Sequence, residues 1–211
     1  VDVTEQDSTG TCFGDIDNDG APDLLVLGNS AGNQLFENSG DGTFTDITLH
    51  SGIGGLELHP SSCTMGDIDG DGLLDIAIAN TFDWHTRLAV MSFDHDDLME
   101  PNQIYKNQGD NIFVDVSRES GILDANIPRI TWAISLLDYD LDGDVDLITG
   151  DDQGGRAPAK YDGFDYGYIR IYSNDGTGIF TELTRDINME IFGAWMGLSF
   201  GDLNSDGNID L

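Results

Sequence analysis

The chain has 211 residues and a formal net charge of -32, because 40 Asp and Glu stand against 8 Lys and Arg. Nucleic acids and anionic membrane surfaces are bound through many Lys and Arg side chains, so this charge excludes both as partners. A hydrophobic content of 39% with 27 glycines is typical of a globular, turn-rich protein. No stretch approaches the roughly 20 apolar residues of a membrane span, which argues against membrane insertion.

Short runs of branched and aromatic residues, separated by turns rich in Gly, Asp and Asn, fill most of the chain and predict strands. They recur in units of four, so the chain contains internal repeats. The predicted strands of the three complete units lie at 10–14, 23–28, 33–38 and 43–48, at 61–66, 74–80, 103–107 and 112–116, and at 131–137, 146–150, 168–173 and 179–184. No long stretch has helical periodicity, which predicts an all-β protein.

Antiparallel four-stranded units repeated along a chain favour a β-propeller, which protects its sheet edges by radial repetition. A sandwich or a solenoid is the alternative. We predict one propeller over residues 1–211, with complete blades at 9–48, 61–116 and 131–184, the last strand of a preceding blade at 1–4, and the start of a fourth blade at 194–211. Because three full blades with partial blades at both ends do not close a ring, we expect a partial propeller.

An acidic loop of the form Asp-x-Asp-x-Asp-Gly-x-x-Asp joins the first and second strands of every unit. It begins at Asp15, Asp67, Asp138 and Asp202, and the last copy has Asn204 at position 3. Carboxylates at positions 1, 3 and 5 of a tight turn point to a common centre, and Gly at position 6 permits the bend. The carbonyl of position 7 and Asp at position 9 complete a cage of hard oxygen ligands, which is typical of a calcium site.

The sequence therefore predicts up to four Ca²⁺ ions in this chain. Each predicted site has five ligands, of which the fourth binds through its backbone carbonyl and the others through their side chains. The four sets are Asp15, Asp17, Asp19, Ala21 and Asp23; Asp67, Asp69, Asp71, Leu73 and Asp75; Asp138, Asp140, Asp142, Asp144 and Asp146; and Asp202, Asn204, Asp206, Asn208 and Asp210. An EF-hand would need Glu at position 12 and a helix after it, whereas Val26, Ile78 and Thr149 stand there within predicted strands. Mg²⁺ fits less well, since it keeps several waters. A site copied at one place in every unit predicts a structural ion, with folding coupled to calcium.

The two cysteines lie just upstream of acidic loops. Cys12 precedes Asp15 by three residues and Cys63 precedes Asp67 by four. In strands this offset turns the two side chains to opposite faces. We therefore predict two buried free thiols and not a disulfide, so cysteine usage leaves the redox compartment open.

The acidic loop followed by a strand, together with Phe-x-Asp-Ile-Thr and Ser-Gly-Ile signatures, resembles the FG-GAP or VCBS repeats of integrin-α-type propellers. The run from Asn33 to Thr48 is similar to the repeats of the cartilage acidic protein group and its bacterial ASPIC/UnbV-type relatives. This resemblance covers nearly the whole chain. It implies a seven- or eight-bladed propeller, secretion and structural calcium at the positions named above. The departure at Asn204 implies a weaker fourth site.

In a propeller the connections between second and third strands lie on the face opposite the acidic loops. Two of them are long, at 81–101 and 151–167, and loops carry function more often than scaffolds do. The possible ligand face that they predict consists of Trp84, His85, Arg87, His95, Lys160, Tyr161 and Tyr166. Aromatic rings beside polar groups can stack on a sugar, and His with Tyr or Lys can act as a base.

These features together predict an extracellular calcium-binding propeller, secreted or at the cell surface, that serves as a protein-binding, glycan-binding or adhesion module. The first alternative is the propeller domain of a carbohydrate-active enzyme of the polysaccharide lyase type. The second is a subunit of an extracellular filament, in which open blade edges assemble with neighbouring chains by strand addition. No nucleophile elbow, zinc-protease motif or phosphate loop occurs, so catalysis stays open, with a binding role favoured.

Overall fold

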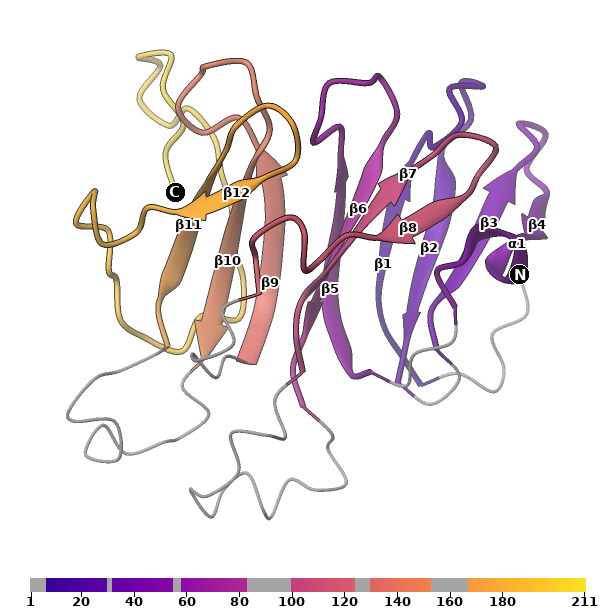
Figure 1. The fold of residues 1–211 in the computed structure, drawn as a ribbon, viewed down its shortest axis with the longest axis horizontal. Helices are drawn as coiled ribbons and strands as arrows, with labels where there is room; N and C mark the ends of the chain where they lie inside the picture. Colours follow the sequence, from indigo (N-terminus) through magenta and orange to yellow (C-terminus); the bar gives the residue numbers. More distant parts are fainter. Residues whose placement is uncertain (1–6, 30–31, 55–57, 83–99, 124–129, 153–166) are drawn as a thin grey trace.

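The computed structural model describes residues 7–29, 32–54, 58–82, 100–123, 130–152 and 167–211 (Figure 1). This part of the chain forms three four-stranded antiparallel sheets. The first sheet contains β1 (Ser8–Gly14), β2 (Asp23–Gly28), β3 (Gln34–Asn38) and β4 (Phe44–Asp46). The second contains β5 (Pro60–Gly66), β6 (Asp75–Asn80), β7 (Gln103–Asn107) and β8 (Phe113–Asp115). The third contains β9 (Ile130–Leu137), β10 (Asp146–Asp152), β11 (Ile169–Asn174) and β12 (Phe180–Glu182).

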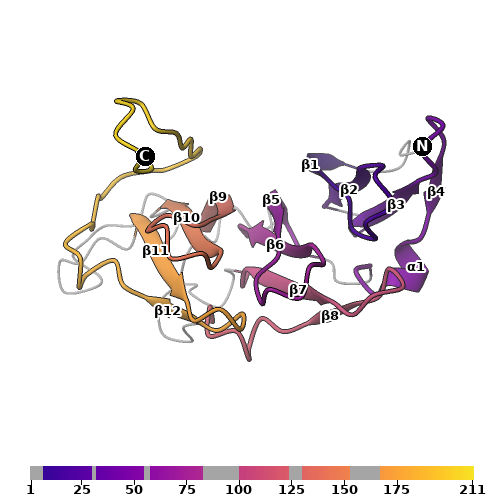
Figure 2. The ribbon, with the colours of Figure 1, turned by 90° about the horizontal axis from the view of Figure 1, so that it is seen from above.

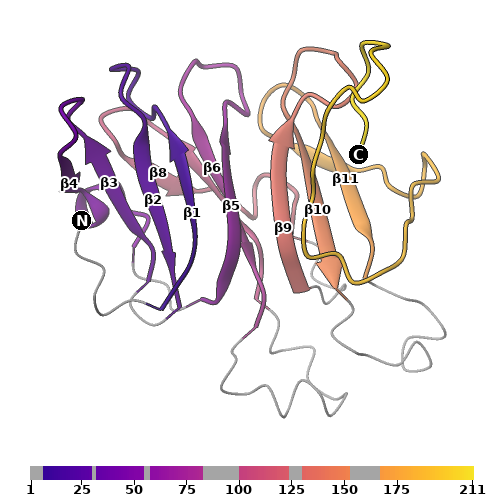
Figure 3. The same cartoon turned by 180° about the vertical axis from the view of Figure 1, so that it is seen from behind.

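The sheets stand side by side and fan out when they are seen from above (Figure 2). In each sheet the strands follow chain order, so every sheet is a meander that begins at β1, β5 or β9. These three first strands lie along one side of the molecule, facing the viewer in Figure 3. Within the described residues the sheets form an open array and no closed barrel, as in the blades of a propeller-like fold.

The second strands of the sheets are largely buried on both faces, and in β6 the two faces belong to two different cores. On β6, Ile76 and Ile78 pack toward the first sheet, whereas Ala77 and Ala79 pack toward the third. Since side chains alternate along a strand, one strand serves both interfaces at once. The continuous apolar run of β6 follows from this placement.

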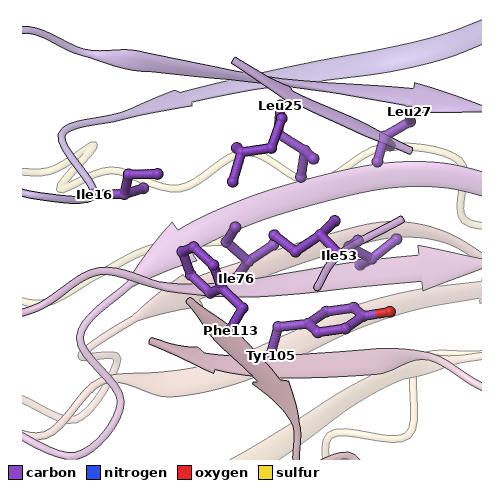
Figure 4. Packing of buried hydrophobic residues seen from close by; sticks show 9 residues of the cluster. Ile16, Leu25, Leu27, Ile53, Ile76, Tyr105 and Phe113 are labelled. Carbon is purple, nitrogen blue, oxygen red and sulfur yellow. The ribbon is translucent and has the colours of Figure 1, made fainter. Parts of the chain in front are cut away.

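The first core lies between the first and second sheets (Figure 4). Leu25 and Leu27 of β2 face Ile76 of β6 and Tyr105 of β7 across it. The second core repeats the arrangement between the second and third sheets. Burial of these side chains removes most of their apolar surface from water, which is the main force that holds neighbouring sheets together.

The Ser-Gly-Ile signature lies where the chain passes from one sheet to the next. Ile53 and Ile122 are buried in the first and second cores. Gly52 and Gly121 have φ of 80° and 82°, in the left-handed region that favours glycine. A Cβ added at Gly121 would lie 2.7 Å from the carbonyl oxygen of Phe180 in the next sheet. The glycine therefore permits both the turn and the close approach of two sheets.

One helix was not predicted. The four-residue helix α1 (Thr48–Ser51) follows β4 and ends at Gly52 in the left-handed conformation. It is too short to show helical periodicity in a sequence. In the described ranges no helix has the length and apolar character needed to cross a membrane.

The prediction of free thiols is wrong, because Cys12 of β1 and Cys63 of β5 form a disulfide with a Cα–Cα distance of 6.0 Å. Cys12 pairs in register with Leu25, and Cys63 with Ile78. Both cysteines pack against the first core. The two cysteines do lie on opposite faces of their sheets, as predicted. However, the face of the first sheet that carries Cys12 packs against the face of the second sheet that carries Cys63, so the two side chains meet.

The C-terminal segment differs from a regular sheet. Residues 194–200 form no strand, and a single antiparallel bridge joins Gly201 to Asp210. A strand needs a hydrogen-bonded neighbour along its length. No described strand pairs with residues 194–200, and the bridge joins two residues of the C-terminal segment itself. Instead, Trp195, Leu198 and Phe200 pack against the third sheet beside Ile148. The strand predicted at 1–4 lies outside the described residues.

Candidate metal centres

The acidic loops of the three sheets connect β1 to β2, β5 to β6 and β9 to β10, at one end of the molecule (upper end in Figure 1). In each loop the carboxylate at position 1 organises the turn. Asp15 accepts hydrogen bonds from the backbone N–H groups of Asp19 (3.0 Å) and Gly20 (2.9 Å). The same position-1 pattern recurs at Asp67, Asp138 and Asp202.

Three groups of carboxylates have ligand atoms that lie within 4.8 Å of one another, a spacing at which one ion can be held. They are Asp15, Asp17 and Asp19; Asp67, Asp69 and Asp71; and Asp138, Asp140 and Asp146. In the third group the position-9 residue Asp146 takes the place of Asp142. The fourth loop makes the same backbone hydrogen bonds, but its carboxylates form no such group among the described residues.

In the three sheets, the carboxylate at position 9 is fully buried and links the acidic loop to the third strand. Asp75 accepts a hydrogen bond from the N–H of Ile68 in its own loop (2.9 Å) and one from the N–H of Asn107 at the end of β7 (2.8 Å). Asp23 and Asp146 make the equivalent pairs with the loop and the third strand of their sheets. Position 9 is thus a brace for the loop as well as a predicted ligand.

An asparagine at the end of the third strand completes this brace and ties neighbouring sheets together. The side-chain amide of Asn107 donates to the carbonyl of Leu74 (3.1 Å) and to the carbonyl of Ile16 in the preceding acidic loop (2.8 Å). Asn174 repeats both contacts, with Val145 and Ile68. Sequence reasoning missed this role, although the asparagine recurs in every unit.

The pKa values of the buried position-9 carboxyls are raised. Burial, which disfavours the charged form, raises the pKa of Asp75 and of Asp146 to about 6. Neighbouring aspartates of the same loop raise these pKa values further, and the two backbone hydrogen bonds oppose the shift. The pKa of Asp23 is raised for the same reasons. Loops without a cation therefore resist full ionisation, and a divalent cation would relieve the repulsion.

The donor set fits Ca²⁺, since it consists of carboxylate oxygens in a compact turn. The residues that would hold the ion are the aspartates at positions 1, 3 and 5 of the first two loops and at positions 1, 3 and 9 of the third loop. The carbonyl ligands at Ala21, Leu73, Asp144 and Asn208 remain predictions. The N–H groups of these four residues donate to the position-5 carboxylates, which fixes the turn at that point.

Position 4 of every loop adopts a left-handed conformation that was not predicted. Its residues are Asn18, Gly70, Leu141 and Ser205, with φ of 61°, 72°, 64° and 63°. This conformation suits Gly and Asn but is costly for Leu. Because Leu141 is also 54% exposed, its side chain has little packing to offset the strain.

Replacing Leu141 by Gly is expected to raise the free energy of unfolding by about 1 kcal/mol, because glycine adopts this φ without strain. Urea unfolding followed by circular dichroism measures the change. The reciprocal substitution Gly70→Leu should lower the free energy of unfolding by a similar amount. A destabilised Leu141→Gly variant would contradict this explanation.

The opposite end of the third sheet contains a buried ion pair. Arg170 of β11 and Asp151 of β10 are both fully buried and in direct contact. The Arg170 guanidinium also lies 4.2 Å from the centre of the Tyr168 ring and 3.8 Å from Glu182. Thr131 of β9 donates a hydrogen bond to Asp151 (2.7 Å). Sequence reasoning missed this cluster, because a charged residue within a strand is ordinarily expected on its solvent face.

The predicted possible ligand face falls outside the described residues. Trp84, His85, Arg87 and His95 lie in 83–99, and Lys160, Tyr161 and Tyr166 lie in 153–166. The strand ends that flank these segments, at β6, β7, β10 and β11, lie at the end of the sheets opposite the acidic loops (Figure 1).

Repeated four-stranded sheets with an acidic loop after each first strand define a class of repeat protein. The chain belongs to the FG-GAP-like repeat family, because the profile of that repeat matches residues 15–78 and 159–211, more than half of the chain. This confirms the predicted resemblance. A stretch of 71 residues is also 35% identical to Cartilage acidic protein 1 of Xenopus tropicalis. The stretch covers 34% of this chain and 11% of that protein, so the chain spans a small part of its relative's length.

Proposed function

We propose that this chain is a calcium-binding β-propeller segment of an extracellular protein, secreted or at the cell surface, that serves as a protein-binding, glycan-binding or adhesion module. The observation that carries the proposal is the recurrence of a carboxylate group at the same place in all three sheets. A single cluster of exposed acidic residues is common in proteins that bind no metal ion there. Three copies at equivalent positions of a repeat favour a shared ligand, and hard oxygen donors favour Ca²⁺.

The proposed ions are structural. Each loop is braced to its own third strand, and Asn107 and Asn174 connect the first and second loops to the following sheets. An ion that fixes such a loop would therefore stabilise the contact between two sheets. Up to four ions are proposed, with the fourth site weakest because Asn204 replaces an aspartate.

The extracellular location is supported by two observations. Disulfides persist in oxidising compartments and are rare in the cytosol, and Cys12 is bonded to Cys63. The relative that shares the repeat carries cartilage in its name.

Calcium stoichiometry tests the proposal. Native mass spectrometry of the whole chain, titrated with calcium, is expected to show three ions bound at lower calcium concentrations than the fourth. The double variant Asp15→Asn with Asp17→Asn should lose one of these three ions and keep the other two. Substitution of two exposed aspartates outside the loops, Asp110 and Asp186, by Asn is the matched control and should lose none. Absence of bound calcium in the wild-type chain would refute the calcium-binding function.

A further inference from the structure

One position of the third strand carries a different charge in each sheet. It is the residue before the bracing asparagine: Glu37 in β3, Lys106 in β7 and Ser173 in β11. The three residues are equivalent by register, since they pair with Thr45, Val114 and Thr181 on the fourth strands. The charge at this position is therefore negative in the first sheet, positive in the second and zero in the third.

In the second sheet this side chain reaches into the acidic loop. The Lys106 ammonium is in direct contact with the Asp69 carboxylate, and it lies 3.9 Å from the Asp71 carboxylate. Both aspartates belong to the group whose oxygens are close enough to hold one ion. The other oxygen of Asp69 is buried and accepts no hydrogen bond from the described residues. Lys106 thus supplies a positive charge at the place where a bound cation would supply it.

Among the ion pairs of the described residues, none joins a Lys or Arg side chain to the first or third loop. Glu37 approaches the next sheet, where its carboxylate accepts a hydrogen bond from the Asn111 side chain (3.3 Å). The Ser173 hydroxyl lies 3.4 Å from the carbonyl of Asn174. Among the ion pairs of the described residues, those of Lys106 are the ones that involve an acidic loop. Among the described ion pairs, the second loop is therefore set apart from the first and third by an ammonium at its carboxylates.

We propose that Lys106 weakens calcium binding at the second loop, so that this loop fills after the first. The inference rests on the calcium-binding function proposed above. A dication that enters the loop must displace the ammonium from Asp69 and is then repelled by it at short range. The Coulomb energy of such neighbours near a protein surface, reduced by salt, corresponds to about a tenfold loss of affinity.

The same contact gives the second loop a second way to keep its shape. When calcium is scarce, the ammonium offsets part of the repulsion among Asp67, Asp69 and Asp71, an effect that no described ion pair provides to the first or third loop. The middle sheet, which both neighbouring sheets pack against, then depends least on calcium. Lys106 thus makes the second site fill after the first and keeps the contacts of the middle sheet in place at low calcium.

Site-resolved titration tests the proposal. The backbone N–H groups of Gly20, Gly72 and Gly143 donate to the position-1 carboxylates of the three loops, so their ¹⁵N–¹H resonances report on one loop each. In the wild-type chain the Gly72 resonance should reach its calcium midpoint at about tenfold higher free calcium than the Gly20 resonance. Lys106→Ser, which installs the residue of the third sheet, should lower the Gly72 midpoint by about tenfold and leave the Gly20 midpoint unchanged.

Two further variants complete the experiment. Arg118→Ser removes the same charge from an exposed turn after β8 and should move no midpoint by more than about twofold. Ser173→Lys should raise the Gly143 midpoint by about tenfold, which would reproduce the effect of Lys106 in another sheet. An unchanged Gly72 midpoint in Lys106→Ser, with all three loops still binding calcium, would overturn this inference and leave the proposed function standing. Glycine resonances that do not move at millimolar calcium would overturn both.

Discussion

Excess chelator is expected to lower the melting temperature of the protein by roughly 15 °C or more. Each ion that binds only the folded state contributes about 2.7 kcal/mol at a calcium concentration one hundred times its dissociation constant. Three filled loops then contribute about 8 kcal/mol, and each kcal/mol is worth about 2–4 °C for a domain of this size. Differential scanning fluorimetry with calcium and with chelator measures the difference. A melting temperature that is the same under both conditions would show that the loops contribute no calcium-dependent stability.

The pH dependence of this shift has a defined sign. In the metal-free chain the pKa values of Asp75 and Asp146 are about 6, above their ordinary value of 3.8. A raised pKa in the folded state means that the contribution of these two carboxyls to metal-free stability is complete below about pH 4 and is lost as the pH rises through about 6. Calcium binds the ionised carboxylates, so it has to compete with protons at low pH. The calcium-dependent shift in melting temperature should therefore be smaller at pH 5 than at pH 7.5, where we expect the shift of roughly 15 °C or more given above.

Asp151→Asn is expected to lower the free energy of unfolding by about 3–5 kcal/mol, or the melting temperature by about 10 °C. The substitution leaves the Arg170 guanidinium fully buried without the carboxylate that it contacts. Glu182, at 3.8 Å, and the Tyr168 ring are weaker partners. Calcium-saturated samples should be compared, so that the acidic loops do not contribute to the difference.

The second sheet provides the matched control for this pair. Asn80 and Gln103 occupy the positions of Asp151 and Arg170 in β6 and β7, and their side chains share a hydrogen bond of 3.3 Å. The double variant Asp151→Asn with Arg170→Gln installs this neutral pair in the third sheet. It should recover at least half of the loss, because no uncompensated charge remains buried. If the single variant melted within 2 °C of wild type, or the double variant were the less stable of the two, the ion pair would not have the role assigned to it.

Local signals in the sequence were sufficient to predict the strands and the acidic loops. A run such as Ile76 to Ala79 is bounded by a turn rich in Asp and Gly, so a strand and its loop are specified by adjacent residues. Repetition then strengthened each prediction, because the same order of strand and loop recurred three times. The carboxylate groups follow from position within the turn, which is also local.

Contacts between sheets could not be predicted in the same way. Strand parity placed Cys12 and Cys63 on opposite faces, but only the stacking of the sheets shows that these two faces meet. The link from Asn107 to Ile16 spans 91 residues, and nothing at either position identifies the other. The left-handed backbone conformation at position 4 could not be predicted from the sequence, because the residues there share no common chemistry: Asn18, Gly70, Leu141 and Ser205.

The disulfide has a consequence for how the array comes apart. In a repeat protein each unit contacts mainly its neighbours, so unfolding ordinarily spreads inward from whichever end unit separates first. Cys12 and Cys63 join the first strands of the first two sheets and hold these sheets together even when their shared core opens. Opening is then easier between the second and third sheets, which share a core but no disulfide. The disulfide thus makes the order of unfolding unequal in an otherwise regular row of repeats, with the first two sheets separating last.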